Sequence, residues 1–176
     1  MAALLAMAFL AAIALPPPEE KPVAFFAYGA NLEGGTMRAR AGWAGNASPA
    51  VLPGFRLVFQ TNRNSEFGVA NAIPDPSSFV AGAIYMLTLE QEKELDSGSG
   101  VPDFYQKIKV RAMQKAGGEA DAVTYVLSGS PSFAPPSRPT LLAASKGLQQ
   151  FGHAQSNQDI LVAAASEAQQ KSGRAS

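Results

Sequence analysis

Apolar and aromatic residues along this chain fall into short runs that are separated by turns rich in glycine and proline. Continuous apolar runs such as residues 23–29 and 79–87 are typical of buried strands, and alternating runs of strands with one exposed face. A turn at Pro53-Gly54 is expected to precede one further strand, and Pro74 is expected to end another. The predicted strands occupy residues 23–29, 55–61, 67–74, 79–87, 104–112 and 121–129.

Helices are predicted mainly towards the edges of this strand pattern. One short helix ends near Gly42, and others cover residues 87–96, 140–151 and 157–171, the last of them capped by Ser156. Strands dominate the middle of the chain while helices flank them. The pattern therefore predicts an α+β fold, with a small mixed β-barrel flanked by helices.

The chain is predicted to form one domain with loose ends. Residues 23–152 make up the domain, after an apolar leader and proline-rich spacer at 1–22 and before a C-terminal helix and disordered tail at 153–176. The first 15 residues carry no charge and are too short for a comfortable membrane span. They contain a small-x-small cleavage pattern at Ala12-Ile13-Ala14 but lack the charged segment of a signal peptide. Cytoplasmic and exported locations both stay open.

Net charge and composition exclude several classes of function. The 14 basic and 14 acidic residues balance, which argues against nucleic-acid binding, because that needs a clustered basic face. The chain has no cysteine, so thiol nucleophiles and zinc–thiolate sites are absent. Its one histidine, His153, is expected to be a bystander near a helix end. A small neutral or zwitterionic ligand suits this composition better.

Residues 29–36, GANLEGGT, follow a predicted strand and open a helix, which almost matches the phosphate loop of nucleotide hydrolases. Gly35 stands where that loop needs its lysine, so nucleotide hydrolysis is rejected. What remains is a glycine-rich turn whose backbone N–H groups suit an anion such as a carboxylate. A tight turn without any ligand is the alternative.

The stretch FAYGANL, which ends at Leu32, resembles the F-x-Y-G-S-N-L signature of the γ-glutamylcyclotransferase (AIG2-like) family. The agreement continues in order through LPGFRLVFQ, GVANAIPDPSSFVAGAIYMLT, LDSGSGVPDFYQKIKV and PPSRPTLLAASKGLQQFG, and so covers residues 23–152. It implies a small β-barrel with a cavity at its mouth. A loop there cradles the γ-glutamyl group, and Ala30 stands where the family usually has serine. The implied cradle residues are Tyr28, Gly29, Ala30, Asn31 and Leu32.

The resemblance also implies a reaction. In this family the α-amino group of a γ-glutamyl compound attacks its own γ-carbonyl, which closes 5-oxoproline and releases an amine or amino acid. Because ring closure is intramolecular, the enzyme has only to fold the substrate, remove a proton from the ammonium and stabilise the oxyanion. The reaction requires no metal and no cofactor. The glutamate of an L-D-x-x-E-G-V motif is the base.

Residues 95–101 read LDSGSGV, which places Ser99 where the family has its catalytic glutamate. The SGSG segment is predicted to be a loop. Serine has no useful acid–base capacity near neutral pH, and a positioned base contributes about 10²- to 10⁴-fold, so we expect cyclisation to be absent or much reduced. A relocated base is the alternative. Glu66 is its first candidate, followed by Glu33 and Asp103, although the default reading of each is an exposed loop acid.

Other residues have two readings each. Tyr105 either lines the cavity or packs in the core, and Arg138 either contacts a substrate carboxylate or lies on the surface before a helix. Asp96 is expected to have a structural capping role and Trp43 to be a packing residue. Three functions stay open: a cyclotransferase for γ-glutamyl amino acids, peptides or amines, a non-catalytic module that binds a γ-glutamyl or similar carboxylate ligand, and a structural remnant with a filled pocket.

Overall fold

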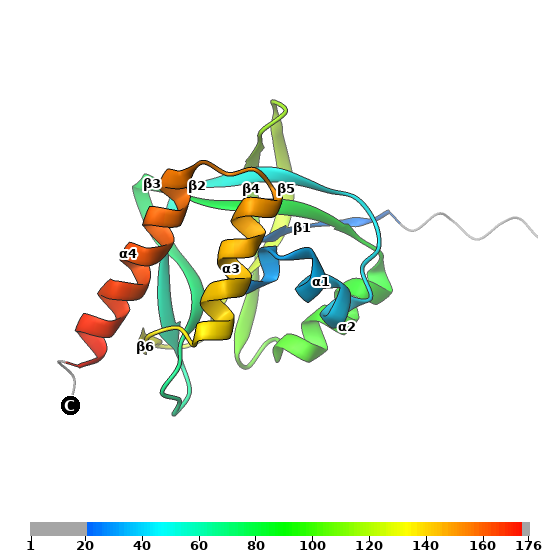
Figure 1. Ribbon diagram of the computed structural model, residues 1–176. Coiled ribbons are helices and arrows are strands. Elements are labelled where there is room, and N and C mark those ends of the chain that lie inside the picture. The colour runs from blue at the N-terminus through cyan, green and yellow to red at the C-terminus, as the bar shows by residue number, and fades with distance from the viewer. Residues whose placement is uncertain (1–20, 174–176) are drawn as a thin grey trace, which may run out of the picture.

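The computed structural model describes residues 21–173, which form a mixed β-barrel with helices packed around it (Figure 1). Strands β3, β1, β5, β4 and β2 follow one another around the barrel, which closes where β3 pairs with β2, and β6 adds to the end of β2. The strands are β1 (Val23–Ala27), β2 (Ala47–Thr61), β3 (Val69–Leu87), β4 (Tyr105–Gln114), β5 (Glu119–Leu127) and β6 (Ser132–Phe133). The predicted α+β fold with a small mixed barrel is confirmed.

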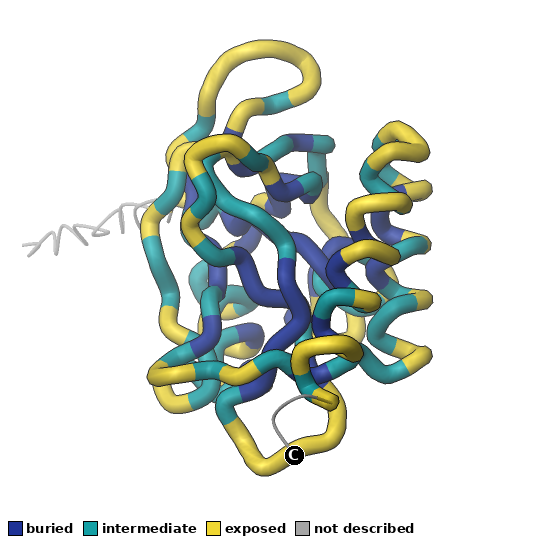
Figure 2. The backbone as a smooth tube through the Cα atoms, turned by 90° about the vertical axis from the view of Figure 1, so that its left-hand side faces the viewer, coloured by how far each residue is buried: buried dark blue, intermediate teal, exposed yellow. Residues whose placement is uncertain are grey.

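The interior of the barrel is apolar, and the buried part of the backbone concentrates in its strands, whereas hairpin tips are exposed (Figure 2). Only β1 and β5 run parallel, and the other paired strands are antiparallel. Each large apolar side chain that is fully buried contributes about 1.5–3 kcal/mol to folding. The largest of these are Phe25, Phe26, Phe59, Tyr85, Leu87 and Leu95.

Two predicted breaks in the β2–β3 hairpin are wrong, because β2 continues through Pro53-Gly54 and β3 continues through Pro74. The register between the strands shifts after Pro53, and Gly54 takes a left-handed φ of 79° at the shift. A bulge leaves backbone groups outside the ladder and therefore tolerates a residue without an N–H. The turn signals in the sequence mark an irregularity within one long hairpin rather than the ends of its strands.

The helices lie outside the barrel, and none of those described is long and apolar enough to cross a membrane. The YGANL segment forms a 3-10 turn, η1 (Gly29–Leu32), and leads into α1. As predicted, α1 ends next to Gly42. The α-helices are α1 (Gly34–Ala41), α2 (Leu89–Ser99), α3 (Arg138–Gln150) and α4 (Gln155–Ser172). The predicted leader and the end of the predicted tail, residues 1–20 and 174–176, lie outside the described residues.

The end of α2 differs from its prediction. The helix continues beyond residues 87–96 to Ser99, and Gly100 caps it with a left-handed φ of 72°. A glycine at this position ends a helix without steric cost. The helix therefore includes the first three residues of SGSG and is capped by its second glycine, Gly100. The predicted loop is therefore wrong: residues 97–99 form the last turn of α2.

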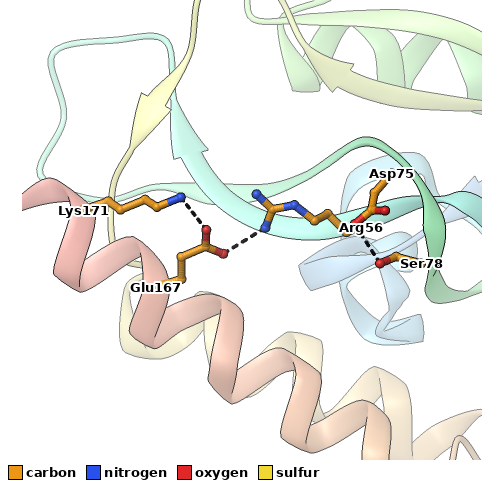
Figure 3. Close-up of polar contacts among 5 residues, drawn as sticks. All are labelled: Arg56, Asp75, Ser78, Glu167 and Lys171. Atoms are coloured by element: carbon orange, nitrogen blue, oxygen red, sulfur yellow. Dashed lines mark hydrogen bonds and ion pairs between the residues drawn. The ribbon is translucent and has the colours of Figure 1, made fainter.

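Charged contacts hold α4 against the barrel (Figure 3). Glu167 of α4 accepts hydrogen bonds from Lys171 at 2.6 Å and from Arg56 of β2 at 2.9 Å. The hydrogen bond from Lys171, together with that from Arg56, lowers the pKa of the Glu167 carboxyl. The helix starts after Ala154, so the predicted cap Ser156 lies inside its first turn, and that prediction is wrong.

Gly82 of β3 lies next to Ala83, the residue that pairs with the end of β1. A side chain there would overlap the Ala27 carbonyl oxygen and the Phe26 ring. We expect Gly82→Ala to lower the free energy of unfolding by about 1–3 kcal/mol, because overpacking pushes the strands apart. Urea unfolding followed by the fluorescence of the single tryptophan measures this change. Gly98→Ala is the control, because its new Cβ meets nothing within 4 Å. An equal loss of stability in both variants would contradict the explanation.

Candidate active site

The YGANL turn owes its shape to one glycine and one close approach. Gly29 has a left-handed φ of 60°, and a Cβ there would overlap the side chain of Ala70 in β3. Leu32 ends the turn fully buried, packed against Gly147 of α3, and its carbonyl accepts a 2.7 Å hydrogen bond from the Tyr85 hydroxyl. The turn is therefore fixed from both sides, by the barrel and by α3.

Tyr28 anchors the start of this turn. Its hydroxyl donates to the Tyr125 carbonyl of β5 at 2.6 Å and accepts from the Ala72 N–H of β3 at 3.0 Å. Burial strongly raises the pKa of the Tyr28 phenol, so it stays neutral at ordinary pH. One side chain thus joins two strands of the barrel at the point where the turn begins.

Two adjoining pockets open beside the turn. The turn pocket, of about 70 Å³, is lined by the turn and by Tyr105 and Tyr125 of β4 and β5. The Ser99 pocket, of about 340 Å³, lies between residues 97–100 at the end of α2 and Arg63 of the β2–β3 loop. Arg40 and Tyr105 line both pockets, which makes them parts of one recess.

The predicted cradle residues divide between this recess and the core. The side of the turn that faces the turn pocket is formed by Tyr28, Ala30 and Asn31. Gly29 and Leu32 do not line it and instead set the path of the backbone. The predicted cradle is thus made of lining residues and of residues that shape the turn from behind.

Ser99 is buried at the wall of the Ser99 pocket. It is 7% exposed, and its hydroxyl makes no hydrogen bond with any residue that the structure describes. A buried hydroxyl without a partner is uncommon, because its desolvation costs about 1–3 kcal/mol. The Ser99 hydroxyl oxygen is shielded from solvent and lies beside the Tyr125 phenol, so position 99 contributes a short, neutral side chain to the wall of the recess.

Asp96 contacts a residue of the recess wall, Tyr125, but its carboxylate is already engaged. It accepts 2.6 Å hydrogen bonds from the Tyr125 hydroxyl and from the Lys107 ammonium. Burial, and then the contact with Asp96, raises the pKa of the Tyr125 phenol, while the nearby Ser99 hydroxyl weakly opposes this rise. The helix α2 continues past Asp96, and the Asp96 side chain forms an ion pair with Lys107 instead of capping the helix end. The predicted capping role is therefore wrong.

The three acids considered as relocated bases lie elsewhere. Glu33 caps α1 through the Thr36 N–H at 2.7 Å and the Thr36 hydroxyl at 2.9 Å, and the hydroxyl contact lowers the pKa of its carboxyl. Glu66 and Asp103 are exposed, the first in the β2–β3 loop and the second just after α2. No acidic residue of the described chain lines either pocket. In the described residues there is also no cluster of side chains suited to a metal ion.

Two arginines that the sequence did not single out line the recess. Arg40 of α1 borders both pockets and donates to the Asn31 side-chain oxygen at 3.0 Å, and Arg63 borders the Ser99 pocket. Arg138, the arginine singled out from the sequence, lies exposed at the start of α3 and lines neither pocket. Arg40 lies in α1, the helix that directly follows the YGANL turn, and this closeness in sequence is a signal that could have revealed it. The sequence around Arg63 contains no such signal.

The remaining singled-out residues are structural. Trp43 is buried and packs edge-on against Tyr85, with 4.6 Å between ring centroids. His153 contacts the Gly82 carbonyl oxygen through Nε2 at 2.8 Å and lines neither pocket. Both positions fit the packing and bystander roles expected from the sequence.

Removing the Tyr28 hydroxyl tests whether it is a structural anchor. We expect Tyr28→Phe to lower the free energy of unfolding by about 1–3 kcal/mol, because the Ala72 N–H and the Tyr125 carbonyl lose a buried partner. Tyr105→Phe is the matched control, since the Tyr105 hydroxyl makes no hydrogen bond with the described residues. Denaturant unfolding of both variants measures the difference. A Tyr28→Phe variant as stable as Tyr105→Phe would contradict the anchor.

Comparison with known proteins agrees with this geometry. The sequence model of the family described as "Gamma-glutamyl cyclotransferase, AIG2-like" matches residues 25–143. A solved structure named γ-glutamyl cyclotransferase shares 25% identity and a TM-score of 0.71, over 81% of this chain and 88% of its own. An uncharacterised human protein gives the same identity and TM-score, over 82% of this chain and 88% of its own.

A more distant structure shares the fold alone. A yeast γ-glutamyl cyclotransferase specific to glutathione is 12% identical, with a TM-score of 0.61 over 86% of this chain and 97% of its own. No curated protein sequence matches the chain. The family model spans most of the barrel and the whole YGANL turn, so the chain belongs to the γ-glutamyl cyclotransferase, AIG2-like family.

Proposed function

We propose that the protein binds γ-glutamyl compounds in the recess and cyclises them slowly to 5-oxoproline, with release of an amine or amino acid. Family membership supplies the type of reaction. The observation that carries the slow rate is the side chain at position 99, a buried serine in a recess that no described carboxylate lines. The protein is therefore proposed as a cyclotransferase that lacks the carboxylate base of its family.

The proposed reaction has a simple balance. The α-amino nitrogen of the γ-glutamyl group forms a bond to the γ-carbonyl carbon, and the bond from that carbon to the leaving nitrogen breaks. One proton leaves the α-ammonium before attack, and a second leaves the same nitrogen as the lactam forms. The departing nitrogen takes up one proton as its bond breaks and another in water, where the free amine becomes an ammonium. Holding the two reacting ends together replaces a bimolecular encounter, which favours reaction even without a strong base.

Side chains around the turn pocket are proposed to hold the γ-glutamyl group. Arg40 and the Asn31 amide suit its α-carboxylate, because a guanidinium offers two parallel donors to a carboxylate. The Tyr105 hydroxyl has no protein partner among the described residues and is free to donate to the γ-carbonyl oxygen. Burial raises the pKa of the Tyr105 phenol to about 12, which keeps it a donor.

The charge of the recess supports slow turnover rather than none. Arg40 and Arg63 both face it, and no described acid faces them there. A nearby positive charge disfavours an ammonium and so promotes loss of its proton, and it also stabilises a developing oxyanion. These effects act without a base. They replace only part of the contribution of a positioned carboxylate.

Introducing a carboxylate at position 99 tests the proposal. We expect Ser99→Glu to raise the release of 5-oxoproline from γ-glutamylalanine by about 10²- to 10⁴-fold, because it supplies a positioned base. Ser99→Gln has nearly the same shape without the base and is expected to gain nothing. Chromatographic measurement of 5-oxoproline gives the rate, and tryptophan fluorescence reports whether each variant folds.

The outcomes separate the readings that the sequence left open. Equal rates in Ser99→Glu and Ser99→Gln would contradict a missing base. Binding of γ-glutamylalanine to the unmodified protein without any 5-oxoproline would favour the non-catalytic binding module. Loss of the residual turnover in Glu66→Gln would assign it to a relocated base and would overturn the proposal that no carboxylate serves the recess.

A further inference from the structure

We infer that Arg63 recognises a carboxylate on the leaving group, so that the preferred compounds are γ-glutamyl amino acids or peptides rather than γ-glutamyl amines. The inference rests on the proposed function, because it takes the γ-glutamyl group to occupy the turn pocket. The larger Ser99 pocket then receives the leaving group. The chemistry of that pocket decides which leaving groups it favours.

The two arginines of the recess have no counter-ion among residues 21–173. Within the described part of the chain, the ion-paired cations are Arg56, Lys107, Arg111 and Lys171. Arg40 and Arg63 form no such pair, and no described Asp or Glu lines either pocket. Like charges that converge on a concave site without compensation concentrate anions there. A recess of this kind fits a ligand with two negative groups.

The guanidinium of Arg63 is positioned before any ligand arrives. Its central carbon lies 4.2 Å from the centroid of the Phe104 ring, a cation–π contact that leaves the outer N–H groups free. Gly100 gives it room, because a Cβ at that position would lie only 3.3 Å from an Arg63 nitrogen. The arginine therefore stands over the end of α2 in a defined place.

The two guanidinium groups differ in the pockets that they border. Arg40 borders both pockets, whereas Arg63 borders only the Ser99 pocket. Burial raises the pKa of the Tyr105 phenol, and the charges of Arg40 and Arg63 both oppose this rise, so both act on the shared wall of the recess. This arrangement assigns Arg40 to the α-carboxylate of the γ-glutamyl group and Arg63 to a second carboxylate further out.

Two ligands that differ only in one carboxylate test the inference. We expect γ-glutamylalanine to bind the unmodified protein about tenfold more tightly than γ-glutamylethylamine by titration calorimetry, because only the first offers a charged partner to Arg63. In Arg63→Gln the two ligands are expected to bind equally, because the charged partner that distinguishes them is gone. Arg38→Gln, the same change at an exposed position of α1 outside both pockets, is expected to keep the tenfold preference.

Each outcome has a definite meaning. Equal binding of both ligands to the unmodified protein, or a preference that survives in Arg63→Gln, would overturn the role of Arg63 and leave the proposed function in place. Failure of both ligands to bind would overturn the proposed function and the inference together. The preference is also expected to shrink as salt is raised, because Arg63 is exposed and its attraction is screened.

Discussion

The hydroxyl of Tyr28 is the contact on which the recess depends. By bonding to β5 and to β3 at once, it fixes the point where β1 gives way to the YGANL turn. Gly29 then presses directly against Ala70 of β3, so the path of the turn follows from the interior of the barrel rather than from the loop itself. The backbone that faces the turn pocket is therefore rigid before any ligand binds, which lowers the entropic cost of binding.

Electrostatics explain why the recess is positively charged although Asp96 lies behind its Tyr125 wall. Asp96 is compensated by Lys107, which also contacts Glu92, and it meets the recess only through the Tyr125 hydroxyl. The ion pair with Lys107 and the hydrogen bond from Tyr125 compensate the charge of Asp96. Arg40 and Arg63, in contrast, have no acid to compensate them in the described structure. The sign of the recess therefore comes from which charges are paired and not from the balanced total of the chain.

Patterns in the sequence predicted the fold class, most strands and the end of α1 next to Gly42, because runs of apolar residues and single glycines act through local structure. They failed at Pro53-Gly54 and Pro74, where a bulge accommodates the prolines within one hairpin, a property that depends on the partner strand. They also failed at residues 97–99, where the choice between loop and helix depends on which glycine provides the left-handed cap. Arg63 was invisible for the same reason, since only folding brings its loop to the end of α2.

The recess is assembled from segments that are separate in the chain. The proposed γ-glutamyl cradle comes from the turn after β1, position 99 from the end of α2, and Arg63 from the tip of a hairpin. Loop tips tolerate insertion and substitution far better than buried turns do. Selectivity towards the leaving group can therefore drift through changes in the hairpin tip alone, while the cradle and the helix end remain as they are. Substitutions in one of these segments can therefore change which substrates bind without altering the core of the barrel.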